Sequence, residues 1–353
     1  MFSLEIPTTV RHLFIILGSN LFAFGLGILV APILIEVLKK FKLKKQIREL
    51  ASDGTQAKLF NQLHAKKSGT PTMGGIMIWT TALFIILFGH LLYVIGLTDR
   101  SLLNRNETYL PLFTLIATAF LGLIDDYFNI AGLGKCKGIN IKPKLFWLTL
   151  FAVLGALWFH FKLGINQIFV PFIGDVYIGA WYIPLFIFII IASANAVNIT
   201  DGLDGLAGGL CIIAFGVLAA ISYAKGLVIL TAFCAIIIGA TSAFLWFNIP
   251  PAKFYMGDTG ALSLGATLGV IAMLTDSVAV FPLIMFIFVM ETLSVIIQLL
   301  SKKFRTKKVF HIAPLHHHFE YLGWPESQIT MRFWIIGAFV AILGLIMRLT
   351  GLL

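Results

Sequence analysis

About ten long apolar runs constrain the fold of this chain more than any other feature of its sequence. Each is close to the roughly 20 residues that an α-helix needs to cross the hydrocarbon core of a bilayer. The runs cover 13–38, 74–97, 110–127, 145–162, 180–199, 205–224, 226–247, 260–276, 279–301 and 331–349. Only 12% of the residues are charged, against about 25% in soluble domains. We therefore expect an all-α polytopic integral membrane protein, with residues 1–353 forming a single transmembrane domain.

The segment 163–179 departs from this pattern. It alternates apolar and polar residues and contains Pro171 and Gly174. Alternation of this kind, interrupted by turn-forming residues, is typical of a β-hairpin. We expect a short hairpin outside the bilayer, between the fourth and fifth spans.

The distribution of charge predicts the orientation. The net charge is +10, and 19 of the 26 Lys and Arg residues lie in five loops on one side of the predicted bundle. These loops are 39–73, 128–144, 200–204, 248–259 and 302–330. Basic loops stay in the cytoplasm, so both termini and the hairpin are predicted to be periplasmic. The basic run at 39–45 is predicted to contact anionic membrane lipids, and we expect no nucleic-acid partner.

Five polar clusters fall on the same predicted cytoplasmic face. They contain an aspartate pair, two loops rich in Asp and Asn, a histidine-rich loop and a basic segment before the second span. Their members are Asp125 and Asp126; Asn198, Asp201 and Asp204; Asn248 and Asp258; His311, His316, His317 and His318; and His64, Lys67 and Thr72. A shared active site at this membrane face explains their common location.

Aspartates gathered at helix ends repel one another unless their pKa values rise or a divalent cation binds them. Oxygen ligands favour Mg²⁺, which proteins usually hold with one or two carboxylates and substrate phosphates. The sequence therefore predicts a phosphorylated substrate, with Lys67, Lys144 and the histidines facing its phosphates. Zinc-site spacings and a P-loop are absent from the sequence, which argues against a zinc enzyme and an ATPase.

Simpler interpretations exist for each cluster. The Asp125–Asp126 pair could be a solvated helix cap, the stretch 198–205 a solvated turn, and the histidine triplet an adventitious metal site. Glu291 lies inside the ninth predicted span, where an acid indicates either function or a hydrogen bond between helices.

Taken together, the motifs resemble the phospho-N-acetylmuramoyl-pentapeptide transferase (MraY) family of the polyprenyl-phosphate N-acetylhexosamine-1-phosphate transferase superfamily. LGLIDDY, NITDGLDGLAGG and PPAKFYMGD are typical of the superfamily, whereas HAKKSGTPTMGG and APLHHHFE are typical of this branch. The resemblance covers essentially the whole chain. It implies an enzyme of the bacterial inner membrane, active at the cytoplasmic face, that moves phospho-N-acetylmuramoyl-pentapeptide from UDP-N-acetylmuramoyl-pentapeptide to undecaprenyl phosphate. The products would be lipid I and UMP, Mg²⁺ would be the cofactor, and the chain would form a homodimer.

The resemblance also implies roles for individual residues. The catalytic set is Asp125, Asp126, Asp258, His316 and His317, with Asp258 as the metal ligand and Asp125 favoured as the base. The substrate-binding set is Lys67, Thr72, Lys144, Asn198, Asp201, Asp204, Asn248, Tyr255, Glu291 and His318. Direct attack by the lipid phosphate is favoured over a covalent aspartyl intermediate.

Two further classes remain as alternatives. A secondary transporter or channel would also carry intramembrane acids, but those usually lie near the bilayer midplane on broken helices. Here only Glu291 has such a position. A structural scaffold would not explain five polar clusters on one face. Within the superfamily, an N-acetylglucosamine-1-phosphate transferase differs in its donor.

Overall fold

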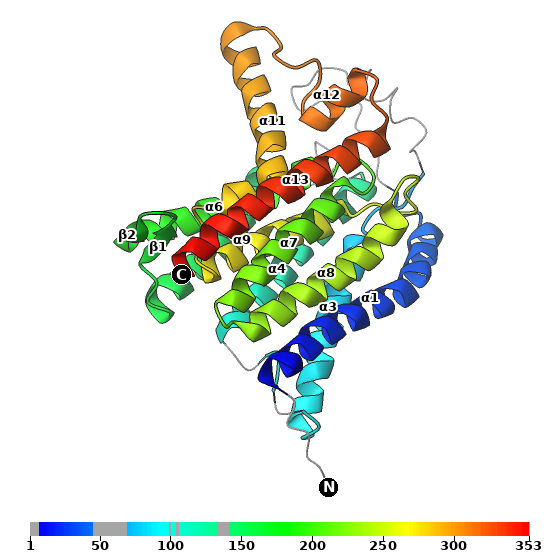
Figure 1. The fold of residues 1–353 in the computed structure, drawn as a ribbon. Helices are drawn as coiled ribbons and strands as arrows, with labels where there is room; N and C mark the ends of the chain where they lie inside the picture. Colours follow the sequence, from blue (N-terminus) through cyan, green and yellow to red (C-terminus); the bar gives the residue numbers. More distant parts are fainter. Residues whose placement is uncertain (1–6, 45–68, 99, 104–105, 133–140, 353) are drawn as a thin grey trace.

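The computed structural model describes residues 7–44, 69–98, 100–103, 106–132 and 141–352, and is dominated by long helices (Figure 1). The longer helices are α1 (Thr8–Lys40), α3 (Gly75–Val94), α4 (Asn106–Ile130), α5 (Ile141–Leu157), α6 (Tyr182–Thr200), α7 (Leu206–Ala224), α8 (Val228–Asn248), α9 (Gly257–Leu274), α11 (Phe286–Arg305) and α13 (Glu326–Leu349). Short elements are α10 (Phe281–Ile284), α12 (Leu315–Tyr321), a π turn at Trp158–Lys162 and 3₁₀ turns at Gly179–Trp181 and Thr350–Leu352.

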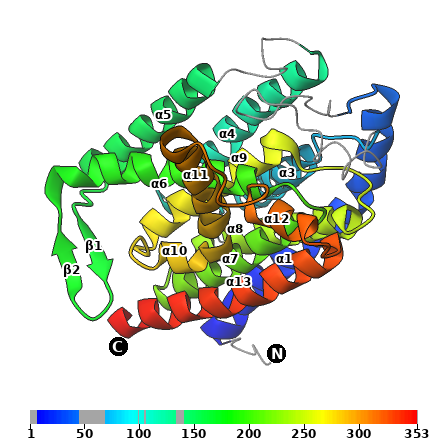
Figure 2. The ribbon, with the colours of Figure 1, turned by 90° about the horizontal axis from the view of Figure 1, so that it is seen from above.

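Within the described ranges, nine helices are long and apolar enough to cross a membrane, so the chain is a polytopic membrane protein. The segment 279–301, expected as the ninth of ten spans, is not among them. It is divided at Met285 into α10 and α11, and the end of α11 carries Lys302, Lys303 and Arg305. Figure 1 shows α11 leaving the inclined bundle, and Figure 2, the view from above, shows it nearly end-on.

Among the nine span-length helices of the described residues, α9 is the most enclosed. Of the most apolar 18-residue stretch of α9, 89% is buried inside the protein, against 28% for the same stretch of α1 at the edge of the bundle. It packs mainly on α4 and α6. The contact with α6 is close because a Cβ at Gly265 would stand 2.5 Å from the carbonyl oxygen of Ser193. The core that surrounds α9 fixes where its first residues stand.

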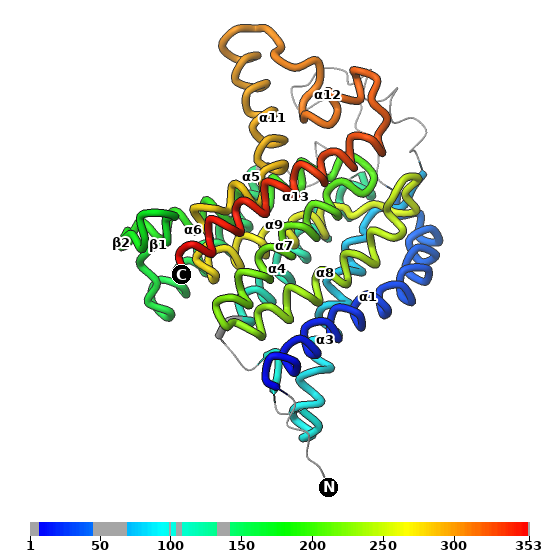
Figure 3. Tube along the Cα trace, in the orientation of Figure 1, coloured from blue at the N-terminus to red at the C-terminus, as the bar shows by residue number. Residues whose placement is uncertain are grey.

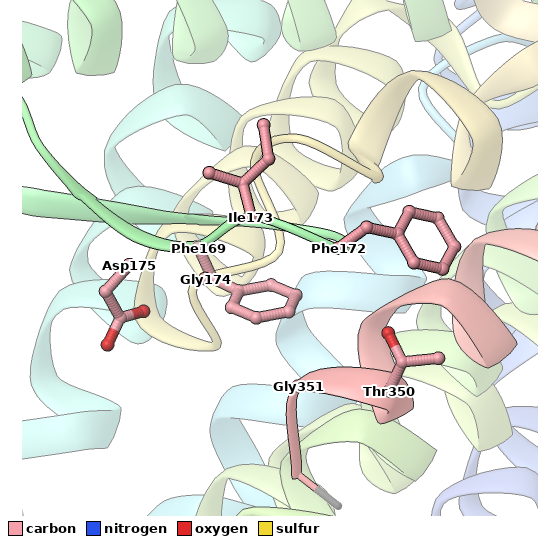
Figure 4. A pocket seen from close by; sticks show the side chains of 7 residues that line it. All are labelled: Phe169, Phe172, Ile173, Gly174, Asp175, Thr350 and Gly351. Atoms are coloured by element: carbon pink, nitrogen blue, oxygen red, sulfur yellow. The ribbon is translucent and has the colours of Figure 1, made fainter.

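The expected hairpin is confirmed. Strands β1 (Gln167–Val170) and β2 (Gly174–Tyr177) pair antiparallel, with Phe169 opposite Asp175. The backbone N–H of Phe169 donates to Asp276 at 2.9 Å, and the Arg348 guanidinium lies over the Phe169 ring at 4.3 Å. The hairpin is therefore anchored on the loop after α9 and on the C-terminal part of α13. A hollow of about 420 Å³ lies between the hairpin and the turn that follows α13 (Figure 4).

The two ends of the bundle differ. We call the end with β1, β2 and Arg348 the hairpin end. The other end, here the site end, holds the α6–α7 turn, the α8–α9 loop and α12; the tube in Figure 3 follows α13 from one to the other. The 24 residues of α13 rise about 36 Å, so these two ends are well separated.

Candidate active site

The centre of the site end is an ion-paired group of three side chains from three helices. Lys144 at the start of α5 donates from Nζ to Oδ2 of Asp125 at 2.8 Å, and also to Oδ2 of Asp258. Asp125 lies near the end of α4 and Asp258 in the first turn of α9. All three side chains are largely enclosed, with 8% of Asp125, 17% of Lys144 and 21% of Asp258 exposed. One ammonium group thus offsets the repulsion between two carboxylates.

Asp126, the neighbour of Asp125, has a different environment. Its two carboxylate oxygens accept the backbone N–H groups of Asp258 at 3.1 Å and Thr259 at 3.0 Å. These are orphan donors of the first turn of α9, where the helix dipole also favours a negative charge. Gly257, with φ of +74°, permits the approach, because a Cβ there would stand 2.5 Å from Oδ2 of Asp126. Asp126 therefore caps α9 from α4 and sets the position of Asp258.

Two more predicted residues border this group. Asn198, near the end of α6, donates from Nδ2 to Oδ1 of Asp258 at 2.8 Å. Thr72 is 1% exposed, and a Cβ on Gly257 would stand 3.0 Å from its Oγ1. Among the described residues this Oγ1 has no hydrogen-bond partner. Residues from four helices and the segment before α3 thus meet around Asp258.

A second group ties the α6–α7 turn to the α8–α9 loop. The side chain of Asn248 accepts from Gly205 N at 3.0 Å and donates to the carbonyl of Phe254 at 2.8 Å. Asp204 accepts from the backbone N–H of Ala252 at 3.0 Å. The two side chains are 3% and 5% exposed. The stretch 198–205 is therefore held by hydrogen bonds to the α8–α9 loop and to Asn248 and is not a solvated turn.

Tyr255 lies in the same loop. Its N–H donates to Pro71 O at 2.8 Å, and its carbonyl accepts from Gly74 N at 2.7 Å. Asp201 follows the last residue of α6 and is half-buried. The loop that carries Tyr255 is thereby joined to the start of α3.

The three histidines of α12 have separate surroundings. His316 is fully buried, with Nδ1 2.9 Å from Oε2 of Glu291 on α11. His317 pairs with Glu320 at 2.6 Å between Nδ1 and Oε2. The His318 ring stacks on His311 with centroids 5.5 Å apart. They do not form a shared metal site, and in the described part of the chain no three His, Cys, Asp or Glu side chains are grouped to hold a metal ion.

The donor set at Asp125 and Asp258 fits a hard divalent cation. Two carboxylates face one position that the Lys144 ammonium already shows to favour positive charge. Mg²⁺ usually takes one or two protein carboxylates and completes its shell with water and substrate phosphates. Two carboxylates beside a lysine are therefore enough for a cation bound together with a diphosphate.

The structure brings together most of the predicted residues at one end of the bundle. Lys67, a predicted nucleotide contact, and His64 lie outside the described residues. Two contributors were missed. Glu326 accepts the backbone N–H of Asp204 at 2.6 Å, and Glu320 pairs with His317. The sequence could have indicated Glu320, because it follows His317 by three residues on a helix. It could also have indicated Glu326, because an acid is favoured at the start of a helix.

Comparison with known proteins decides the family. A relative from Chloroflexus aggregans named phospho-N-acetylmuramoyl-pentapeptide-transferase is 40% identical over 93% of this chain and 88% of its own length. Relatives of the same name from Borrelia garinii subsp. bavariensis and Borrelia hermsii are 38% and 39% identical, each over 93% of both chains. The chain belongs to the phospho-N-acetylmuramoyl-pentapeptide-transferase family.

Two family profiles add detail to this assignment. Glycosyl transferase family 4 matches residues 108–276, which include Asp125, Asp126, Asp204 and Asp258. A signature of the phospho-N-acetylmuramoyl-pentapeptide-transferase family matches residues 67–78, which include Thr72. The sequence resemblance to this family is thus confirmed. The matched segments contain the carboxylates that α4 and α9 bring together.

Proposed function

We propose that this chain transfers phospho-N-acetylmuramoyl-pentapeptide from UDP-N-acetylmuramoyl-pentapeptide to undecaprenyl phosphate, giving lipid I and UMP. The observation that carries the proposal is the group formed by Asp125, Lys144 and Asp258 in a chain of this family. Phosphoryl transfer asks a protein chiefly for positioning and for neutralisation of charge, and this group supplies both.

The reaction is a displacement at the phosphorus that carries the sugar. An oxygen of the lipid phosphate forms the new P–O bond, the P–O bond to UMP breaks, and its electron pair stays on the UMP phosphate. Asp125 accepts the proton of a monoprotonated lipid phosphate, and Lys144 donates to the diphosphate. A Mg²⁺ ion held by Asp258 would neutralise charge on the diphosphate and on the leaving UMP. Direct attack needs no covalent intermediate, because the lipid phosphate oxygen is already a nucleophile.

The nucleotide half of the donor is proposed to bind at the α6–α7 turn and the α8–α9 loop. Asp201, Asp204 and Asn248 border it, Tyr255 would stack on the base, and Lys67 and His318 complete the set. His316 and His317 would act near the phosphates. Support comes from the hydrogen bonds that join Asn248 and Asp204 to both segments.

The orientation is also proposed. The basic loops support a cytoplasmic site end and a periplasmic hairpin. Labelling of a Phe172→Cys variant with a membrane-impermeant maleimide tests this, since Phe172 at the hairpin is 83% exposed. Labelling in intact spheroplasts supports the orientation, whereas labelling only after lysis contradicts it. The unsubstituted protein gives the background labelling. Separately, the mass of the purified protein in a mild detergent tests the proposed homodimer.

UMP release by purified protein in detergent tests the reaction. UMP should appear only with undecaprenyl phosphate and UDP-N-acetylmuramoyl-pentapeptide, and EDTA should abolish it. Asp258→Asn should abolish it too, whereas Asp276→Asn, an acid at the hairpin end, should retain it. Release of UMP from UDP-N-acetylglucosamine instead would indicate an N-acetylglucosamine-1-phosphate transferase. No release from either donor by folded protein would contradict the proposal and favour a transporter.

A further inference from the structure

Glu291 and His316 form a completely buried polar pair between α11 and α12. Both side chains are 0% exposed. One carboxylate oxygen, Oε1, accepts the backbone N–H of His316 at 3.1 Å, and the other, Oε2, lies 2.9 Å from the ring Nδ1. Glu291 therefore contacts both the main chain and the ring of a single residue, which fixes the orientation of that ring.

The pairing also determines which ring nitrogen carries the proton. A carboxylate offers only acceptor sites, so we assign the ring proton to Nδ1, which donates it to Oε2 of Glu291. The other nitrogen, Nε2, is then the atom left for a further partner. It is buried, and among the described residues it has no hydrogen-bond partner. An unsatisfied buried polar atom destabilises the folded protein, which calls for an explanation.

The unpaired Nε2 is directed at the turn after α6. A Cβ built on Gly202 would stand 2.2 Å from Nε2, closer than any side chain could tolerate. Gly202 lies between Asp201 and Asp204, the two acids of the turn. The imidazole therefore faces the backbone of the segment proposed to hold the nucleotide donor, and only glycine leaves it the space to do so.

We infer that Glu291 is a positioning residue, which holds His316 as the Nδ1–H tautomer so that Nε2 can accept a hydrogen bond from an O–H or N–H group of the bound nucleotide donor. This inference rests on the proposed function. It gives Glu291 an indirect part in substrate binding, since its own carboxylate is occupied by His316. A purely structural contact between helices would require the carboxylate but would place no demand on Nε2.

Glu291→Gln is the most direct test. It preserves the size of the side chain and both of its contacts with His316, but it reverses the tautomer of the imidazole. The glutamine Oε1 still accepts the backbone N–H of His316, and its amide N–H₂ then donates to Nδ1. The proton moves to Nε2, which can no longer accept. We expect kcat/KM for the nucleotide donor to fall about 10- to 100-fold, as when a functional histidine loses the partner that orients it.

The matched control is Ser294→Ala. Ser294 is a buried polar residue one turn further along α11, and its hydroxyl donates to the backbone carbonyl of Glu291 at 2.6 Å. We expect its kcat/KM to stay within a few-fold of the unsubstituted enzyme. An equal loss in both variants would mean that α11 is merely sensitive to polar changes and would overturn the inference.

Solid-state NMR of protein labelled with ¹⁵N-histidine reads the tautomer without any assay. Eight histidines are present, and His316→Gln assigns the signal of interest. We expect a protonated Nδ1 in the unsubstituted protein, a protonated Nε2 in Glu291→Gln, and a shift of the Nε2 resonance on addition of UDP-N-acetylmuramoyl-pentapeptide. The first and third results need only the assignment variant and do not depend on the folding of Glu291→Gln.

An Nε2–H tautomer in the unsubstituted protein, or an Nε2 resonance indifferent to the donor, would overturn the inference. So would a reversed tautomer with unchanged kcat/KM. If the unsubstituted protein releases no UMP while its Nε2 resonance still responds to the nucleotide, the proposed reaction fails and the positioning role stands.

Discussion

Asn198 donates a hydrogen bond to Asp258 at 2.8 Å, although the two residues are 60 positions apart in the chain. The bond joins the end of α6 to the first turn of α9. With Lys144 on the other oxygen of Asp258, both oxygens of this carboxylate have a partner. The orientation of the proposed metal ligand is thus set by residues from two other helices.

Replacing Asn198 tests this arrangement. Asn198→Ala removes one hydrogen bond to an ionised group, worth about 1.5–3 kcal/mol, so we expect kcat for UMP release to fall about 10- to 100-fold. The control is Asn195→Ala, which removes a hydrogen bond to Ile191 O on the same helix. Equal activity of the two variants would show that the bond to Asp258 is unimportant.

The two adjacent aspartates should respond differently to substitution. Asp126→Ala leaves two N–H groups at the start of α9 without acceptors, so we expect a clear loss of stability, about 1–3 kcal/mol for each group left unsatisfied. Asp125→Ala should abolish UMP release with a much smaller change in thermal unfolding. Both quantities can be measured on the same purified samples. The assignment of roles is wrong if Asp125→Ala proves the less stable variant.

The sequence predicted the fold where hydropathy alone determines it. In the part of the chain that the structure describes, nine of the predicted spans are helices long and apolar enough to cross a membrane. Pro171 and Gly174 correctly indicated a turn between alternating segments. The break at Met285 was not predictable, because Met285 is an apolar residue inside an apolar run. The break at Met285 and the basic residues Lys302, Lys303 and Arg305 at the end of α11 separate this segment from an ordinary span.

For the site, the sequence placed the clusters on one face but could not distribute the roles. Consecutive residues of an α-helix point about 100° apart, so Asp125 and Asp126 face different neighbours. Which of them faces Lys144, and which caps α9, depends on how α4 and α9 cross. Similarly, the polar character of Asn248 indicated function, but its bonds to Gly205 and Phe254 follow from the approach of two separate loops.

At the hairpin end, Asp276 should give the protein a pH-dependent stability. Burial raises the pKa of its carboxyl above the ordinary 3.8, against the N–H of Phe169 and the nearby charges of Lys225 and Arg348. The folded state therefore binds more protons than the unfolded state between 3.8 and the raised pKa, so stability falls as pH rises through that window.

Asp276→Asn should flatten this dependence, because asparagine does not titrate and its side-chain oxygen can still accept from Phe169. The measurement is the thermal unfolding midpoint from pH 3.8 towards neutrality, for both proteins in the same detergent. An unchanged slope in the variant would contradict the assignment to Asp276.

Direct measurement of cation binding tests the central claim that Asp125 and Asp258 form the reaction centre. Mn²⁺, which prefers the same oxygen ligands as Mg²⁺, can be titrated by electron paramagnetic resonance with the nucleotide donor present. We predict one donor-dependent site in the unsubstituted protein and in Asp276→Asn, and an affinity at least about tenfold weaker in Asp258→Asn, equivalent to about 1.4 kcal/mol. Equal Mn²⁺ affinity in all three proteins would contradict the account.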